Sequence, residues 1–246
     1  MTVYSPSSAF LLVGGKDISG DTFQLASSVE QILTQSDGLG DSMEERLPVG
    51  KAKVSLTATG GFYDSRTAGI NDAFELAGTT RQVVGYGFVG YAIGAEAVMI
   101  DGAFVAKYNR IATRDDLTRA NGEYVVSGQL YRGIILHGLT AETTDPGSTQ
   151  SSSVDNAASS AGGLTADLHV TALTLGGFTS LTCKVRHSTD NVTFADLITF
   201  TTVTAAGTTE RKTVAGTVNR YLAMSWDFIG SGSGESAVPY VCAVRL

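Results

Sequence analysis

A cluster of charged side chains offers the most obvious chemistry in this sequence, and it consists of Asp41, Glu44, Glu45 and Arg46. Paired carboxylates can act as general acid and base in glycoside hydrolysis when they face a sugar-sized cleft lined by aromatic rings. The surrounding stretch, residues 35–64, contains no tryptophan and reads as a long polar loop that leads into a strand. We therefore interpret the cluster as a solvated loop or a charged interface and predict no catalytic residue.

Histidine and cysteine, the other residues that could hold a metal or act as nucleophiles, are scattered. His137, His169 and His187 fall on predicted strands or at strand ends, whereas a metal site or catalytic triad needs partners that converge within bonding distance. Cys183 and Cys242 are too few for a disulfide framework and are not spaced as zinc ligands. We expect structural histidines, reduced core cysteines, no metal and no cofactor.

Residues 85–90 spell the glycine pattern G-x-G-x-x-G. A dinucleotide site needs a helix to open after these glycines, so that its N-terminus holds the pyrophosphate. Residues 91–94 instead continue an aromatic, β-prone run. The match is interpreted as chance, and no other catalytic motif suggests an enzyme.

The composition favours strands and turns over helices. The chain has 246 residues, 43% of them hydrophobic and 17% charged, with 29 glycines and four prolines; this length suits one large all-β domain or, as we prefer, two ordinary ones. The net charge of −7 argues against a nucleic-acid clamp, because groove binders gain affinity from lysine and arginine. DNA that meets this protein is expected to slide past.

The first residues, 1–13, lack the basic region of a signal peptide and are too short to cross a membrane. We therefore expect a product that has no membrane partner and stays soluble in the cell where it is made.

The first half, residues 1–138, has the pattern of a sheet with one helix. Alternation over residues 51–59 predicts a half-buried strand that ends at Gly60-Gly61. The predicted helix has apolar residues at i, i+3, i+4 and i+7 and a glycine stop, namely Ile70, Ala73, Phe74, Ala77 and Gly78. Asp101-Gly102 and Asn121-Gly122 predict turns, and residues 28–33 fit either a helical turn or a strand.

The second half begins after residues 139–163, whose small polar composition predicts a flexible or extended linker. Residues 164–246 show short strands at regular spacing, typical of an antiparallel β-sandwich. The expected core residues alternate along the last two strands: Leu222, Met224, Trp226, Phe228, Val238, Tyr240, Cys242 and Val244.

The first half resembles the major tail (tail tube) proteins of long-tailed bacteriophages. The resemblance lies in the acidic loop 37–50, the strand 51–59, the Gly-Phe-Tyr-Asp exit at 61–64 and the helix that follows. The second half resembles the second domain of longer phage major tail proteins through residues 166–172, 185–191, 193–197 and 216–222. These segments sample nearly the whole chain.

The resemblance implies a mainly β fold: an N-terminal tail-tube-like β-sandwich or barrel and a C-terminal antiparallel β-sandwich. It also implies a virion tail protein that assembles with itself and with other tail proteins into stacked rings, whose lumen DNA passes without specific binding. Residues 164–246 would either decorate six-membered rings or form a second tube-like domain in three-membered, pseudo-sixfold rings; we favour six. Asp41, Glu44, Glu45 and Arg46 would then lie in an inter-subunit or inter-ring loop.

An alternative interpretation is a carbohydrate-binding or adhesion module on a virion surface. It rests on residues 188–194 and on Trp226 in the predicted sandwich. Exposed aromatic rings would favour it, whereas the alternation around Trp226 predicts a buried ring.

Overall fold

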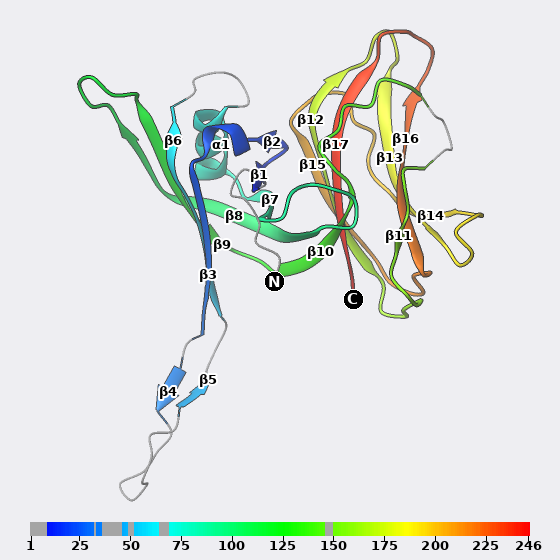
Figure 1. Cartoon of the computed structure of the whole chain (residues 1–246), viewed down its shortest axis with the longest axis horizontal. Helices are drawn as coiled ribbons and strands as arrows, with labels where there is room; N and C mark the ends of the chain where they lie inside the picture. The colour runs from blue at the N-terminus through cyan, green and yellow to red at the C-terminus, as the bar shows by residue number, and fades with distance from the viewer. Residues whose placement is uncertain (1–8, 32, 36–45, 49–51, 64–68, 146–149) are drawn as a thin grey trace, which may run out of the picture.

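The computed structural model describes residues 9–31, 33–35, 46–48, 52–63, 69–145 and 150–246, and these form antiparallel sheets with one short α-helix (Figure 1). The predicted mainly β fold is confirmed. The elements of the first half are β1 (Phe10–Val13), β2 (Lys16–Asp17), the 3-10 helix η2 (Ser19–Asp21), β3 (Gln24–Glu30), β4 (Leu33–Gln35), β5 (Arg46–Pro48), β6 (Lys53–Phe62), α1 (Ile70–Thr79), β7 (Gln82–Gly87), β8 (Glu96–Ile111), β9 (Arg119–Val126) and β10 (Leu130–His137).

The second half consists of strands alone in the part that the structure describes. They are β11 (Val154–Asp155), β12 (Leu164–Thr174), β13 (Ser180–Ser188), β14 (Ala195–Thr199), β15 (Thr208–Val214), β16 (Tyr221–Ile229) and β17 (Ser236–Arg245). Of the ambiguous residues 28–33, residues 28–30 belong to strand β3 and Leu33 begins β4, and the strand predicted to stop at Gly60-Gly61 continues to Phe62.

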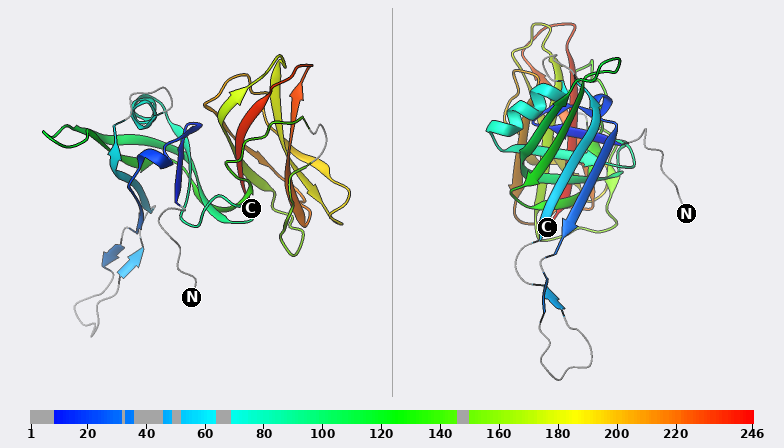
Figure 2. Two further views of the ribbon diagram at one scale, coloured as in Figure 1. Left: turned by 45° about the horizontal axis from the view of Figure 1, so that its top comes forward. Right: turned by 90° about the vertical axis from the view of Figure 1, so that its left-hand side faces the viewer.

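One large sheet runs through both halves in the order β15-β12-β17-β10-β8-β7-β1-β2. Strand β8 is long enough to belong to two groups: its first part pairs with β7 and β10, and its second part pairs with β9, which continues to β6 and β3. The sheet therefore branches at β8, and the β9-β6-β3 branch extends away from the second half (Figures 1 and 2).

Helix α1 covers one face of that branch. Its residues Ile70, Ala73, Phe74 and Ala77 are buried, as the periodicity predicted. They pack in one core with Leu56 and Tyr124 of the sheet and with other apolar residues of strands β1 and β7. A helix of this length is marginal in isolation and is stabilised by such packing.

Both dipeptides that predicted turns lie inside strands instead. Asp101-Gly102 belongs to β8 and Asn121-Gly122 to β9. The glycines give room to neighbours, since a Cβ at Gly102 would collide with the side chain of Arg81 and one at Gly122 with the ring of Phe74. Glycine within a strand marks the close approach of another group here, not a change of direction.

The second half is a sandwich in which the sheet β11-β16-β13-β14 faces the β15-β12-β17 end of the large sheet. Leu222, Met224, Trp226 and Phe228 of β16 are buried in its core, as expected. Both cysteines are unpaired and buried, and burial raises the pKa of the Cys183 thiol to about 12.

Strand β17 differs from its prediction, because it is buried on both faces. Ala237, Val241 and Ala243 face the sandwich core. Tyr240 and Cys242, which were expected in that core, pack instead with Phe10 and Met99 of the first half, and Val244 lies at the margin of the same cluster. The expected alternation is present, but the face assigned to the sandwich forms the junction between the halves.

Residues 139–163, apart from 146–149, lie along the sandwich and bond to it through the backbone. Glu142 exchanges two backbone hydrogen bonds with Ala237, and Ser160 exchanges two with Val218. Strand β10 pairs with β17, so the large sheet is continuous across the predicted boundary near Gly138. The division into residues 1–138, 139–163 and 164–246 stays a prediction.

Candidate assembly interface

The branch formed by β3, β6, β9 and residues 104–111 of β8 is called the wing here. Its four strands are antiparallel neighbours throughout. Its two faces differ sharply in what they contact. On the covered face, Leu56, Ala58 and Tyr124 are fully buried against α1.

The opposite face of the wing has no element packed on it in the part of the chain that the structure describes, and the right-hand view of Figure 2 looks onto it. Its side chains are mostly small and polar, because Ser55, Thr57 and Thr59 alternate along β6 with the buried residues. Neighbouring strands bond across it: Ser28 Oγ lies 2.8 Å from Ser55 Oγ, and Thr59 donates to Gln24 at 3.1 Å.

Opposite charges also lie across from one another on this uncovered face. The register places Glu30 opposite Lys53 and Lys107 opposite Glu123. Cross-strand pairs of opposite charge stabilise a sheet modestly. The face is therefore polar and close to neutral, although the whole chain is acidic.

Both edges of the wing are unpaired within the described residues. Strand β3 pairs with β6 alone, and β8 from Phe104 onward pairs with β9 alone. A free strand edge presents backbone N–H and C=O groups that another chain can bond. The wing thus offers two donor-and-acceptor edges on opposite sides of one sheet.

Strands β4 and β5 form a two-stranded arm that continues from β3 and β6 and projects from the body (Figure 1). Of the predicted site residues, Asp41, Glu44 and Glu45 lie outside the described residues. Arg46 begins β5, and its backbone is paired with that of Gln35. Their role at an interface stays a prediction.

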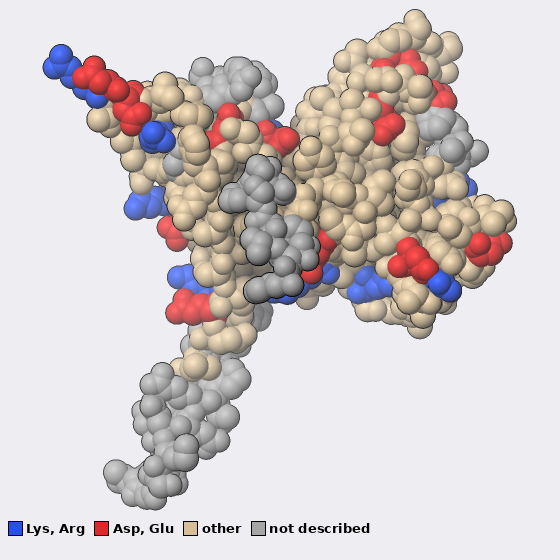
Figure 3. Space-filling view, viewed as in Figure 1, with Lys and Arg blue, Asp and Glu red and all other residues tan. Residues whose placement is uncertain are grey.

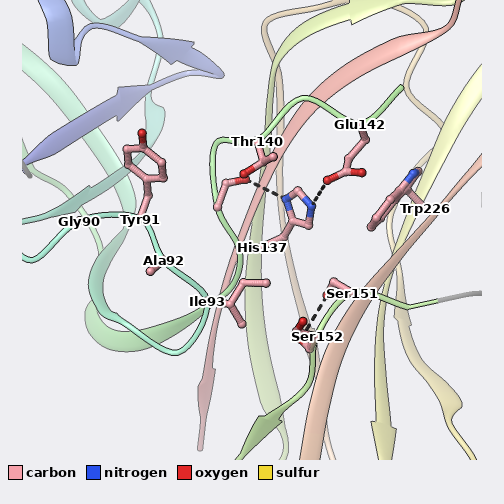
Figure 4. A pocket seen from close by; sticks show the side chains of 11 residues that line it. Gly90, Tyr91, Ala92, Ile93, His137, Thr140, Glu142, Ser151, Ser152 and Trp226 are labelled. Atoms are coloured by element: carbon pink, nitrogen blue, oxygen red, sulfur yellow. Dashed lines mark hydrogen bonds and ion pairs between the residues drawn. The ribbon is translucent and has the colours of Figure 1, made fainter. Parts of the chain in front are cut away.

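A pocket of about 620 Å³ lies between the β7–β8 loop and the sandwich (Figure 4). His137 is central to it, and its Nε2 lies 2.9 Å from Glu142 Oε1. Its Nδ1 lies 2.8 Å from the carbonyl oxygen of Gly138 and 3.0 Å from that of Pro239. These partners hold residues 138–142 against β17, which is a structural role.

The Ser151 hydroxyl and the Trp226 indole of this pocket have hydrogen-bond partners. Ser151 Oγ donates to the Leu136 carbonyl at 3.3 Å and accepts from the Met224 amide at 3.2 Å. Trp226 is 8% exposed, and its Nε1 donates to the carbonyl of Thr144 at 3.1 Å. Ser151 therefore has no base that activates it among the described residues, and the Trp226 ring is buried, whereas Tyr91, which also lines the pocket, is 49% exposed.

A buried ion pair lies at the junction of the halves. Arg211 donates two hydrogen bonds of 2.5 Å to Asp167, which is 1% exposed. Burial raises the pKa of Asp167 to about 6, although the Arg211 bonds oppose this shift. Burial also lowers the pKa of His169 to about 3, so this histidine is neutral. Both groups lie between layers and not in a cleft.

No three His, Cys, Asp or Glu side chains are placed to hold a metal ion among the residues described. The same part of the chain has no helix long and apolar enough to cross a membrane.

The wing edges were missed by sequence reasoning. The alternation along residues 51–59 was visible, but which strands flank it depends on pairing over long separations. One signal was present: the small polar side chains of β6 and the serines of β3 are unusual for strands that another layer covers.

Comparisons with known proteins found structural likenesses but no sequence family. No family model and no curated protein matches the sequence. Among solved structures, a chain of the virion of a native gene transfer agent particle aligns at 11% identity, covering 53% of this chain and 98% of that one, with a TM-score of 0.41. A chain from the tail of an empty particle of this kind, with C6 symmetry, aligns at 11% identity, 50% and 92% coverage and a TM-score of 0.41.

The Dit (gp 19.1) protein of phage SPP1, described as a hub of the adsorption apparatus, aligns over 96% of this chain and 99% of its own, at 10% identity and a TM-score of 0.32. All three scores are below 0.5, and these likenesses do not by themselves establish a shared fold.

Proposed function

We propose that this chain is a structural subunit of a phage tail tube, located in the virion tail and made in the host cytoplasm. Copies of the chain would join into rings, and the rings would stack around a lumen through which DNA passes. The proposed role is non-enzymatic, and other tail proteins would meet the ends of the tube. The observation that carries this proposal is the wing, with its two unpaired edges and one uncovered face.

The two edges are suited to each other. Because all neighbouring wing strands are antiparallel, β3 and β8 run in opposite directions. A second copy related by rotation can therefore set its β3 beside residues 104–111 of the first copy as an antiparallel pair. The edges also complement each other in charge, since β3 carries Glu30 as its ionisable residue and this part of β8 carries Lys107 and Arg110.

Such a contact uses different surfaces on the two copies, and heterologous contacts close into rings or continue as helical filaments. Six copies are favoured over three pseudo-sixfold ones. The two sheets of the second half cover each other, and residues 150–246 contain no α-helix, so this half has no equivalent of the wing. It would decorate the outside of the ring.

The uncovered face would line the lumen. Its small hydroxyl side chains and paired charges do not form the basic groove by which many proteins hold nucleic acid, although Phe104 of β8 exposes an aromatic ring on this face. DNA would consequently pass without specific binding.

Electron microscopy of the purified protein tests the proposal directly. We expect rings or tubes for the natural chain. The double variant Ala26→Lys and Ser28→Lys places two charges on the exposed β3 edge, and charged edges resist pairing; it should fold and remain monomeric.

Val192→Lys is the matched control, because Val192 is 79% exposed in a loop of the sandwich. It should assemble as the natural chain does. A natural chain that stays monomeric at high concentration, or an edge variant that still forms rings, contradicts the proposal.

A further inference from the structure

We propose that the pocket around His137 binds a neutral sugar, with the ring of Tyr91 as the surface on which one sugar unit stacks. The pocket lies between the β7–β8 loop, residues 88–95, and the residues that follow β10. Residues 188–194, which suggested sugar binding in the sequence, do not line it. This activity goes beyond the proposed structural role, because it needs neither a ring nor a tube.

The pocket has the size and the position of a ligand site. Its volume is about 620 Å³, within the range of about 300–1,000 Å³ that is usual for small-molecule pockets. Such pockets occur preferentially where two units of a fold meet. Figure 4 shows Tyr91 of the first half on one side of His137 and Trp226 of the second half on the other.

The β7–β8 loop exposes apolar side chains, although surface loops are usually polar. Residues 88–95 contain no charged or amide side chain. Tyr91 is 49% exposed and Ile93 is 38% exposed, and both line the pocket. Exposed apolar side chains that cluster mark interaction sites, and a tyrosine ring combines an apolar face with a polar tip. One face of a sugar ring carries C–H groups, which pack on such an aromatic face.

The loop is held in place by backbone contacts with the other wall of the pocket. The Gly94 amide donates to the Ile135 carbonyl at 2.8 Å. A Cβ at Gly138 would collide with the carbonyl oxygen of Tyr91, so the loop backbone lies directly against the chain that follows β10. A wall that is already ordered loses little conformational entropy when a ligand binds.

The ionisable groups in the pocket carry no net charge. The Nδ1 of His137 lies 2.8 Å from the carbonyl oxygen of Gly138 and 3.0 Å from that of Pro239. Carbonyl oxygens only accept hydrogen bonds, so Nδ1 carries a proton. The 2.9 Å contact between Nε2 and Glu142 Oε1 needs one further proton, on the ring or on the carboxyl group. The pair is therefore neutral, and the other described residues that line the pocket are uncharged.

Polar groups at the mouth of the pocket are available to a ligand. Thr140 and Ser152 line it and are exposed, and their hydroxyl groups have no hydrogen-bond partner in the described part of the chain. Each hydroxyl can donate and accept. Glu142 contacts His137 through Oε1, which leaves Oε2 as a further acceptor. Sugar hydroxyl groups, which also donate and accept, match this set.

The same features disfavour other classes of ligand. Phosphate groups are bound by arginine and lysine, and neither lines the pocket. Figure 3 shows acidic and basic groups interspersed over the visible face, without a continuous basic surface among the described residues. A cation would meet a carboxyl group that the His137 proton already neutralises. A purely apolar ligand would leave the polar groups of the pocket without partners, which is costly.

Titration of the natural chain with defined sugars tests the proposal. Trp226 is the single tryptophan of the chain and lines the pocket, so its fluorescence reports binding there, and calorimetry gives the affinity. The neutral probes are maltotriose and the trimer of N-acetylglucosamine, which separate plain hexoses from acetamido sugars. The cationic comparison is the trimer of glucosamine.

At least one neutral probe should bind with a Kd below about 10 mM, and at least about tenfold more tightly than the glucosamine trimer. Failure of both neutral probes to bind overturns the proposal. Tighter binding of the glucosamine trimer also overturns it, because the pocket would then select a cation.

Two substitutions in one loop test the role of the Tyr91 ring. Tyr91→Ala should weaken binding at least about tenfold, which corresponds to about 1.4 kcal/mol, whereas Tyr91→Phe, which keeps the ring, should stay within about threefold. Phe88→Ala is the matched control, because Phe88 is 44% exposed in the same loop but does not line this pocket. It should bind as the natural chain does. Equal losses from Tyr91→Ala and Phe88→Ala overturn the proposal.

Electron microscopy separates this proposal from the proposed function. Tyr91→Ala should assemble as the natural chain does while its sugar binding is weakened. A Tyr91→Ala chain that fails to assemble but binds the sugar as before overturns the proposal. If the natural chain binds the sugar and forms neither rings nor tubes, the proposed function fails and the sugar site stands.

Discussion

The two ends of the large sheet are built for different tasks. At the β12–β17 end, both faces of the sheet are buried, and the ion pair between Asp167 and Arg211 lies between layers. At the wing, one face is buried under α1, the other is uncovered, and two edges are unpaired within the described residues. Buried layers stabilise the folded monomer, whereas unpaired edges and uncovered faces leave backbone and side-chain groups available to bind a partner.

This difference predicts which property of the protein a substitution at each end should change. A change at the β12–β17 end should alter the free energy of unfolding of the monomer. A change on the uncovered side or the edges of the wing should leave that free energy nearly unaltered and act on assembly.

The largest effect is expected for Arg211→Met, which leaves Asp167 buried without its partner. Breaking a buried pair in this way costs about 3–5 kcal/mol. Arg220→Met removes a similar two-bond partner from Asp155, but on the surface, and should cost far less. Chemical denaturation of both variants checks this, and equal losses would contradict the proposed difference between the two ends.

A second effect should appear in the pH dependence of stability. The folded pKa of Asp167, about 6, is raised above the ordinary value, so its protonated form is favoured by folding. Its contribution is fully present below the unfolded pKa and is lost as pH rises through about 6, by up to about 3 kcal/mol.

Asp167→Asn should remove this dependence. The free energy of unfolding, measured from pH 4 to 8, should fall less steeply for the variant than for the natural chain across pH 4 to 6. Parallel curves would show that Asp167 does not titrate in this range.

A smaller effect is expected on the covered face of the wing. Gly122→Ala would push a Cβ into the Phe74 ring, and overpacking of this kind costs about 1–3 kcal/mol. Gly78 near the end of α1 has open space around it, so Gly78→Ala is the control and should be neutral or slightly stabilising. Thermal unfolding of the two variants distinguishes them, and an unchanged Gly122→Ala would mean that the helix shifts freely on the sheet.

The smallest effect on the monomer is expected for reversal of the arm charges, in Glu44→Lys, Glu45→Lys and Arg46→Glu combined. The sequence predicts a polar loop here, and substitutions in such loops usually change stability by less than about 0.5 kcal/mol, yet this variant should stack poorly. Thermal unfolding and electron microscopy of one preparation measure both. A loss of monomer stability without a loss of stacking would place these residues in the fold and not at an interface.

The sequence by itself determined the local structure of this protein. Alternation predicted the strands of the sandwich and the buried side of β16, and the spacing of Ile70, Ala73, Phe74 and Ala77 predicted α1. These patterns can be recognised in the sequence because they depend on residues two to four positions apart.

Only the tertiary structure decided how these pieces combine. The sequence could not show that Gly102 and Gly122 make room for Arg81 and Phe74 inside strands, because those neighbours are distant in sequence. Nor could it show that Tyr240 and Cys242 face the first half, or that β3 and the end of β8 are edges. The alternation of apolar and polar residues shows that a strand has two different faces. Pairing between strands that are distant in sequence decides which elements contact each face and each edge.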